Sequence, residues 1–482
     1  MHCFGKVPQK ILGINDLSSL SSSKVRKITC GKSHCLMLFK DGRLGCFGNN
    51  DNGQLGVDSK KYSQNINDLM VYTPEIPLME KFDIWDIAAG DNYSLLIIGK
   101  NLHSMLVRFG YMNSDRDGND KNICGSQSAT NIIAQSAPGT HPDVPVLTAL
   151  HSNPNNNYFD GNDSNSNMNS GFINGDLLGE ENCVNLDNNA ISIVDLDYEN
   201  VSNFAKIFAF GERSMILTGS NEIYVGGIDF RRNRIDDYYL VDHFETNIKS
   251  IAIGLDHCLI LDIDGHLYGI GDGSLGQLGP RRPVNADKPF RILKNYFDHK
   301  IIKIATGLNH SLVLLENGDV FEFGEDYSRK QNDDQKVGNE KPLFVDFDMK
   351  KGGNNVNEQN SPSPPEDSCF SSQNSPYQQQ FKQNSSVSDA GVNDKKIIDI
   401  YSGYNHNVAV AESGEIYAWG DMNYDKLGTK REKGKNYLFK PIEMSTMKGR
   451  YASHIALGEE MTTIISTSFH GSLFSASKST LV

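Results

Sequence analysis

Short runs of alternating apolar and small residues recur along the chain, and residues 251–279 show the pattern most clearly. The sequence there is IAIGLDHCLILDIDGHLYGIGDGSLGQLG, in which each apolar run is too short for a helix. A Gly-x-x-His motif separates the first two runs, and an Asp-Gly turn separates the second from the third. Alternation punctuated by glycine is typical of antiparallel strands joined by tight turns. We therefore expect successive strands of one sheet.

This stretch is one copy of an internal repeat, which makes it the unit of the fold. Copies open at Gly31, Gly90, Gly211, Gly254, Gly307, Gly403 and Gly458. Four of them keep the histidine, as His34, His257, His310 and His406. A four-stranded sheet cannot bury both of its faces alone, and radial stacking of such sheets solves the problem. The sequence therefore predicts an all-β protein, a seven-bladed β-propeller.

The first residues predict how the ring closes. Cys3-Phe4-Gly5, followed by Gly13, repeats the spacing of Cys46-Phe47-Gly48 and Gly56. The sequence thus begins with the end of a repeat and finishes with the start of one. Pairing the two would remove free strand edges. We expect residues 3–13 to pair with the segment 471–476, and residues 1–482 to form a single propeller of four-stranded blades.

Two low-complexity insertions interrupt the repeats. Residues 119–200 and 329–393 are rich in Asn, Ser, Gly and Asp, as in HSNPNNNYFDGNDSNSNMNSG. Such segments bury too little apolar surface to offset their ordering entropy, so we expect both to be disordered. Two interpretations stay open: exposed padding, or regulation by phosphorylation of Ser361, Ser363 and Ser375, each of which precedes a proline.

Composition excludes several classes of partner. The net charge of −14 argues against a surface devoted to nucleic acid or to a membrane. No apolar run reaches the roughly 18 residues that a membrane span needs, so we expect no membrane partner. The eight cysteines form no Cys-x-x-Cys pair, which favours a reducing compartment. We expect a monomer.

Sequence motifs for catalysis are absent. Gly31-Lys32-Ser33 has the letters of a phosphate loop without its upstream glycine, and Cys30, His34 and Cys35 lack a second ligand pair for a metal. The repeated histidines fit a structural role, in which each hydrogen-bonds the backbone of a neighbouring blade. We therefore expect no catalytic residue, no metal and no cofactor.

The residues between each opening glycine and the histidine position are free to vary, because strand register does not depend on them. All seven pairs should project from one end of the ring, either as a solvated surface or as a binding site. They are Lys32-Ser33, Asp91-Asn92, Glu212-Arg213, Leu255-Asp256, Leu308-Asn309, Tyr404-Asn405 and Glu459-Glu460.

The repeats resemble the regulator of chromosome condensation family. The matching segments are GKSHCLMLFKDGRLGCFGNNDNGQLG (31–56), GLDHCLILDIDGHLYGIGDGSLGQLG (254–279) and GYNHNVAVAESGEIYAWGDMNYDKLG (403–428). The resemblance implies guanine-nucleotide exchange on a Ran-like small GTPase, without covalent chemistry. It also implies a nuclear protein, and a cytoplasmic pool is compatible with it. Chromatin or histones are weaker partners, because the family's basic N-terminal tail has no counterpart before Cys3.

In the family's founding member, acidic residues of these loops contact the GTPase, and a wedge inserts near the nucleotide. By resemblance, Asp91 is the first acidic contact and residues 111–118 are the wedge. Arg213 stands where the family has its next acid, with Glu212 beside it, and a later histidine contact corresponds to His310 or is replaced by Asn309. The implied GTPase-binding residues are Asp91, Asn92, Tyr111, Asn113, Asp115, Glu212, Arg213, Asp256 and His310.

Two other functions remain open. The propeller alone can serve as a scaffold for protein–protein interaction, for example as an adaptor in ubiquitin or kinase pathways, and Arg213 favours this alternative. An enzyme that acts on small molecules at the propeller axis is the third possibility, and the chain shows no catalytic residues for it.

Overall fold

The computed structural model describes fourteen segments, namely residues 1–5, 25–57, 70–72, 82–100, 103–110, 133–135, 146–148, 191–194, 204–279, 286–294, 296–325, 338–347, 395–429 and 436–468. Nearly all regular structure in them is strand, as the alternating pattern predicts, apart from the 3-10 turns η5 (Asn423–Asp425) and η6 (Ser445–Met447). Within these segments, no helix has the length and apolarity to cross a membrane.

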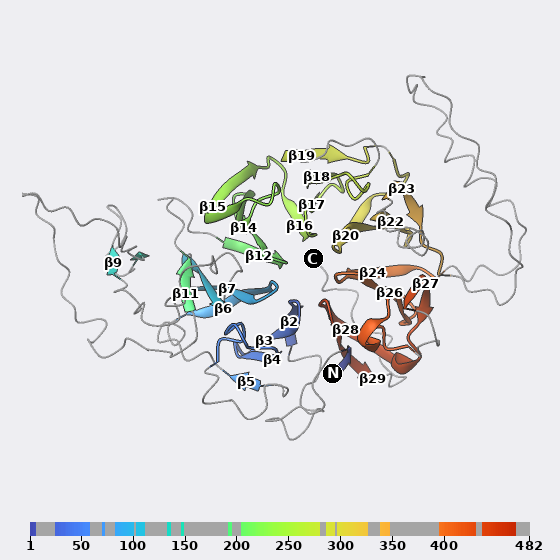
Figure 1. Cartoon of the computed structure of the whole chain (residues 1–482), viewed down its shortest axis with the longest axis horizontal. Coiled ribbons are helices and arrows are strands. Elements are labelled where there is room, and N and C mark those ends of the chain that lie inside the picture. The colour runs from blue at the N-terminus through green and yellow to red at the C-terminus, as the bar shows by residue number, and fades with distance from the viewer. Residues whose placement is uncertain are drawn as a thin grey trace, which may run out of the picture.

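Six antiparallel four-stranded sheets and one three-stranded sheet form a seven-bladed propeller, which confirms the predicted fold (Figure 1). The expected four strands are found in six blades, whereas the described residues supply three strands to the seventh. The sheets are arranged as a ring, and the chain runs around it from blue to red. Blade 1 is β2 (Val25–Cys30), β3 (His34–Phe39), β4 (Leu44–Gly48) and β5 (Met70–Tyr72); blade 2 is β6 (Asp83–Ala89), β7 (Tyr93–Lys100), β8 (His103–Gly110) and β11 (Ile191–Val194); blade 3 is β12 (Phe204–Phe210), β13 (Arg213–Thr218), β14 (Glu222–Ile228) and β15 (Arg234–His243).

The second half of the ring repeats the same order. Blade 4 is β16 (Ile248–Ile253), β17 (His257–Asp262), β18 (Leu267–Gly271) and β19 (Ala286–Ile292); blade 5 is β20 (Ile301–Thr306), β21 (His310–Leu315), β22 (Val320–Glu325) and β23 (Gly338–Phe344); blade 6 is β24 (Ile397–Ser402), β25 (His406–Ala411), β26 (Ile416–Asp421) and β27 (Tyr437–Glu443); blade 7 is β28 (Arg450–Leu457), β29 (Met461–Ser468) and β1 (His2–Gly5).

Blade 7 joins the two ends of the chain, as predicted, but through a different segment. Strand β1 pairs with Met461–Ile464 of β29, and the expected partner 471–476 lies outside the described residues. The repeat register explains the difference. In blades 1, 4, 5 and 6, the glycine that ends the third strand pairs with the histidine position of the second, as Gly48 does with His34. Gly5 obeys the same rule with Met461.

Both expected insertions contain the outermost strand of a blade, so their predicted boundaries are wrong. Ile191–Val194 forms β11 and pairs with Leu106–Phe109 of β8, although it falls within 119–200. Gly338–Phe344 forms β23 and pairs with β22, although it falls within 329–393. A short hairpin of β9 (Ile133–Gln135) and β10 (Val146–Thr148) also lies in the first range. Residues 345–347 of the second range are also described, and the rest of both insertions lies outside the described residues.

The hydrophobic core is divided into seven clusters, one between each pair of neighbouring blades. The second strand of each blade builds two of them, because its side chains alternate between the two faces of the sheet. In β3, Leu36 and Leu38 face blade 2, whereas Cys35, Met37 and Phe39 face blade 7. This explains why these strands are buried along their whole length and read as continuous apolar runs.

The opening glycines allow the blades to approach closely near the axis. A Cβ atom on Gly254 would lie 2.7 Å from the carbonyl oxygen of Gly307, and one on Gly403 would lie 2.7 Å from that of Gly458. Contacts this short are excluded for real side chains, so the close approach requires glycine. The residues that follow each glycine are thereby brought together around the axis.

Candidate partner-binding rim

The loops that join the first and second strands of the blades meet at one end of the ring, and we call them the rim. Backbone hydrogen bonds link neighbouring loops. The amide of Asp91 donates to Gly211 O (2.8 Å), and that of Leu255 donates to Leu308 O (3.0 Å). The amide of Leu308 donates in turn to Tyr404 O (2.8 Å). The rim is therefore built from residues far apart in sequence.

The repeated histidines hold the blades together beneath the rim. His34 Nε2 lies 2.9 Å from Ser94 Oγ of blade 2, and His257 Nε2 lies 3.0 Å from Ser311 Oγ of blade 5. Ser94 donates its proton to Gln54 O (2.7 Å), so it accepts from the protonated Nε2 of His34. The predicted structural role is right, although the direct partner is a side chain. Burial lowers the pKa of His34 to about 4 and that of His257 to about 3.

These two histidines predict a loss of stability on acidification. Unfolded histidine binds a proton near pH 6.5, whereas the buried rings stay neutral until about pH 4 and 3, so the unfolded state binds more protons between these values. Stability is complete above pH 6.5 and falls as the pH is lowered through this window. We expect each histidine to account for about 2 kcal/mol of the loss at pH 5 in urea unfolding.

The matched variant is His34→Gln, which cannot titrate in this range. It should lose about 2 kcal/mol less than the parent between pH 7.5 and pH 5. His299→Gln, at an exposed histidine, should keep the parent's pH dependence. If the parent and His34→Gln lose the same free energy of unfolding between pH 7.5 and pH 5, His34 is not a source of the pH dependence.

Asp91 occupies the centre of the rim. Its carboxylate accepts a hydrogen bond from the hydroxyl of Tyr404, a residue of blade 6. Burial raises the pKa of Asp91, opposed by the Tyr404 hydrogen bond and by Lys32, and Glu459 and Glu212 raise it further. The side chain is therefore less accessible than a residue on a free exposed loop.

The acidic residues Asp91, Glu212, Glu459 and Glu460, which we call the acidic rim, come from blades 2, 3 and 7. Lys32 of blade 1 lies among them, with its Nζ 3.2 Å from Glu459 Oε2. The hydrogen bond with Glu459 raises the pKa of Lys32, and the charges of Asp91 and Glu460 add to the effect. Four carboxylates outnumber Lys32, and the nearby ammonium of Lys426 is paired with Asp421, so this sector is negative.

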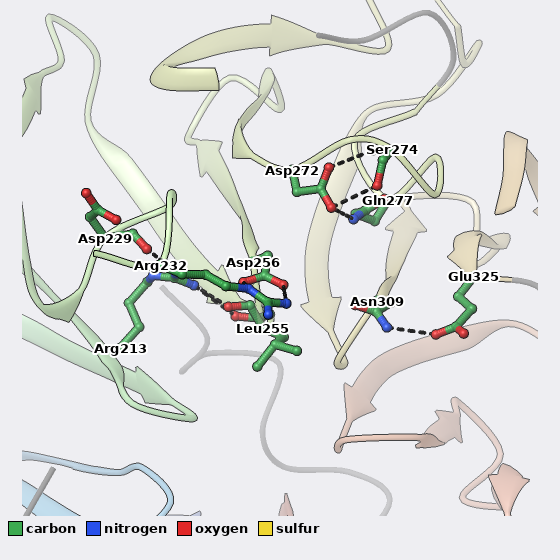
Figure 2. Close-up of polar contacts among 11 residues, drawn as sticks. Arg213, Asp229, Arg232, Leu255, Asp256, Asp272, Ser274, Gln277, Asn309 and Glu325 are labelled. Atoms are coloured by element: carbon green, nitrogen blue, oxygen red, sulfur yellow. Dashed lines mark hydrogen bonds and ion pairs between the residues drawn. The ribbon is translucent and has the colours of Figure 1, made fainter. Parts of the chain in front are cut away.

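Arg213 does not belong to the exposed part of this surface. Its side chain is buried, and the guanidinium donates to the carbonyl oxygens of Ile228 (2.9 Å), Asp229 (2.6 Å) and Leu255 (2.5 Å) (Figure 2). Burial lowers its pKa, and its Cζ lies 4.5 Å from the centre of the Phe230 ring. Arg213 thus positions the blade 4 loop against blade 3.

Asp256 is held by an ion pair within the chain. Arg232 donates from Nε to Oδ1 (2.9 Å) and from Nη2 to Oδ2 (2.5 Å), as Figure 2 shows. Arg232 adopts a left-handed backbone conformation (φ 64°) at the turn between β14 and β15, which aims its side chain at blade 4. The Asp256 side chain is only 11% exposed. A partner can use Asp256 only by displacing Arg232.

The remaining predicted residues occupy different environments. Asn92 is half-buried in the Asp91 loop. His310 is buried between blades 5 and 6, with Nε2 2.9 Å from the side chain of Asn407, and therefore offers no surface to a partner. Asn309 donates to Glu325 Oε2 (2.8 Å) (Figure 2). Tyr111, Asn113 and Asp115 lie outside the described residues.

A group with metal-ligating side chains occurs in the turn after β17. Asp262, Asp264 and His266 place one ligand atom each within 4.8 Å of one another. Asp262 is fully buried and already accepts from the amides of Asp264 (2.9 Å) and His266 (2.8 Å). Because these hydrogen bonds come from the backbone of the same turn, we interpret the three residues as a hydrogen-bonded turn rather than a metal site.

Three contacts of the rim were not predicted from the sequence, although Tyr404 itself was among the predicted rim residues. Tyr404 binds Asp91, Arg232 binds Asp256, and Lys426 donates to Glu459 O (2.8 Å). The sequence carried a signal for Lys426 alone, because it replaces the glutamine of the Gly-Gln-Leu-Gly repeat ending. The contacts of Tyr404 and Arg232 depend on how the blades are arranged.

Comparison with known proteins agrees with this geometry. Residues 25–54, 248–277 and 397–425 match the regulator of chromosome condensation (RCC1) repeat, as do residues 264–314 and 413–465. The chain resembles the structure of Prp20p from Saccharomyces cerevisiae (TM-score 0.58, 15% identity, 97% of this chain and 91% of that one). It also resembles human WBSCR16 (TM-score 0.57, 15% identity, 93% and 87%).

Curated relatives match over shorter stretches. The E3 ubiquitin-protein ligase HERC2 of Homo sapiens is 24% identical over 256 residues, which are 52% of this chain and 4% of that protein. The secretion-regulating guanine nucleotide exchange factor of Bos taurus is 25% identical over 188 residues, which are 38% of this chain and 31% of that protein. The chain matches less than a third of the length of either relative.

The protein is a β-propeller in which the loops between the first and second strands of the blades adjoin one another at one end of the ring. More particularly, the parts of blades 1, 4, 5, 6 and 7 that fall in these ranges match regulator of chromosome condensation repeats, which confirms the resemblance seen in the sequence.

Proposed function

We propose that the protein is a guanine-nucleotide exchange factor for a Ran-like small GTPase. The observation that carries the proposal is the acidic rim, a negative sector assembled at one end of the ring from loops of blades 2, 3 and 7. A relative that is 25% identical over 188 residues is named as a guanine nucleotide exchange factor, and Prp20p is described with binding to Gsp1p and histones. By the same analogy we propose a nuclear location.

The mechanism is differential binding without covalent chemistry. A GTPase holds the nucleotide phosphates with basic groups, which lose their partner when the nucleotide leaves. Carboxylates of the rim would pair with these groups and stabilise the nucleotide-free state. A protein shifts such an equilibrium only by its difference in affinity for the two states. Residues 111–118, which follow the end of β8, remain our proposed wedge.

The decisive experiment is release of a fluorescent GDP analogue from purified Ran in excess GTP. The protein should accelerate release in proportion to its concentration and at substoichiometric amounts. Glu459→Lys/Glu460→Lys, which reverses two charges of the acidic rim, should abolish most of the effect. Release at the intrinsic rate with the parent protein would refute the proposal.

The second candidate is a binding scaffold, favoured by the internal bonds of Arg213, Asp256 and His310, three of the residues implied by the resemblance. A scaffold would bind GDP-loaded and nucleotide-free Ran equally, or neither form. An exchange factor must prefer the nucleotide-free form, so titration of immobilised protein with both forms separates the two functions.

A further inference from the structure

Tyr404 lies at the axis of the ring and contacts four blades. It belongs to blade 6, and its carbonyl accepts from Leu308 of blade 5. Its ring stacks on Phe210 of blade 3, with centroids 4.5 Å apart and planes inclined by 30°. Its hydroxyl reaches Asp91 of blade 2, three blades away around the ring. Only 7% of the residue is exposed.

The hydrogen bond from Tyr404 engages Asp91, the carboxylate that a basic partner of the rim would bind. A guanidinium binds a carboxylate most strongly when it engages both oxygens at once. The hydroxyl of Tyr404 already holds Oδ1 of Asp91, and the Tyr404 ring is fixed in place by its stacking on Phe210. A guanidinium that engages both oxygens of Asp91 therefore competes with the Tyr404 hydroxyl for Oδ1.

Among the seven rim loops, only that of blade 6 has an aromatic residue directly after the opening glycine. The equivalent residues are not aromatic: they are Lys32, Asp91, Glu212, Leu255, Leu308 and Glu459. Tyr404 is buried, but it is not a member of any of the seven hydrophobic clusters described between the blades.

We propose that Tyr404 is a latch, which occupies Asp91 in the free protein and must release it before the acidic rim binds a basic partner. The inference rests on the acidic rim as the binding surface of the proposed function. When only a fraction of the protein molecules is in the conformation that can bind, the apparent affinity is reduced by that fraction. Tyr404 thereby sets the affinity and selectivity of the rim, because only a partner that pairs well with Asp91 offsets its release.

The test uses a hexa-arginine peptide, titrated calorimetrically into the full chain. Tyr404→Phe keeps the ring and its stacking but removes the hydroxyl, and it should bind the peptide about tenfold more tightly than the parent. Tyr401→Phe is the matched control, because it removes a tyrosine hydrogen bond to a different carboxylate, Asp399 (2.5 Å), away from the rim. It should bind like the parent.

In an Asp91→Asn background, Tyr404→Phe should change the affinity less than twofold. Equal or weaker binding by Tyr404→Phe would overturn the latch, as would a gain that persists without the Asp91 carboxylate or an absence of peptide binding in every variant. Circular dichroism melting confirms that each variant is folded. Because the peptide carries no nucleotide, a functional latch with no release from Ran would refute the exchange activity alone.

Discussion

Asp91→Ala is expected to slow nucleotide exchange on Ran by roughly thirty-fold to several thousand-fold. Truncating a desolvated charge at an interface costs about 2–5 kcal/mol, which corresponds to that range if the loss falls on the nucleotide-free complex. Asp91 is the central member of the acidic rim, because the charges of Lys32, Glu212 and Glu459 all act on it. The measurement is the second-order rate constant of GDP release.

The control is Asn405→Ala, on the equivalent loop of blade 6, which should reduce the rate much less. Asp91→Ala also affects folding, because the substitution leaves the buried Tyr404 hydroxyl without its acceptor. We expect a loss of about 1–3 kcal/mol in stability. Rates must therefore be measured well below the melting temperature. Exchange at the parent rate would favour the scaffold function.

The fold could be predicted from the sequence because repetition multiplies a weak local signal. One alternating run does not reveal which sheet its strand belongs to, but seven copies of the repeat, four of them with Gly-x-x-His, specify register, turn and blade number together. The outer strands β11 and β23 could not be predicted, because they lack this repeated signal. They lie beside low-complexity sequence and carry no motif at a fixed offset from the opening glycine.

The site was harder to predict, because a rim position gives the location of a backbone but not the contacts of its side chain. Asp256 and Glu459 occupy equivalent rim loops, of blades 4 and 7, yet one is held by Arg232 and the other faces Lys32. Arg213 lies one residue before the histidine position, where the analogy expects an exposed acid, and its long side chain instead turns inward to three carbonyls. Such choices depend on residues in neighbouring blades.

Lys426→Met is expected to destabilise the protein by about 3 kcal/mol. The Lys426 side chain is 2% exposed, and its Nζ donates to Asp421 Oδ2 (2.6 Å) and to Glu459 O (2.8 Å), linking blade 6 to the acidic rim of blade 7. Removing one member of a buried ion pair leaves the other charge without compensation, which costs about 3–5 kcal/mol. The partial exposure of Asp421 places the expected loss at the lower end.

The matched control comes from the repeats themselves. In blade 4 the equivalent residue is Gln277, whose amide contacts Asp272, the counterpart of Asp421 (Figure 2). Lys426→Gln should therefore restore the common arrangement and cost less than about 1.5 kcal/mol, because a neutral donor still serves Asp421. Urea unfolding of the two variants measures the difference. If methionine and glutamine are equally tolerated, the buried ion pair does not hold blade 7 in place.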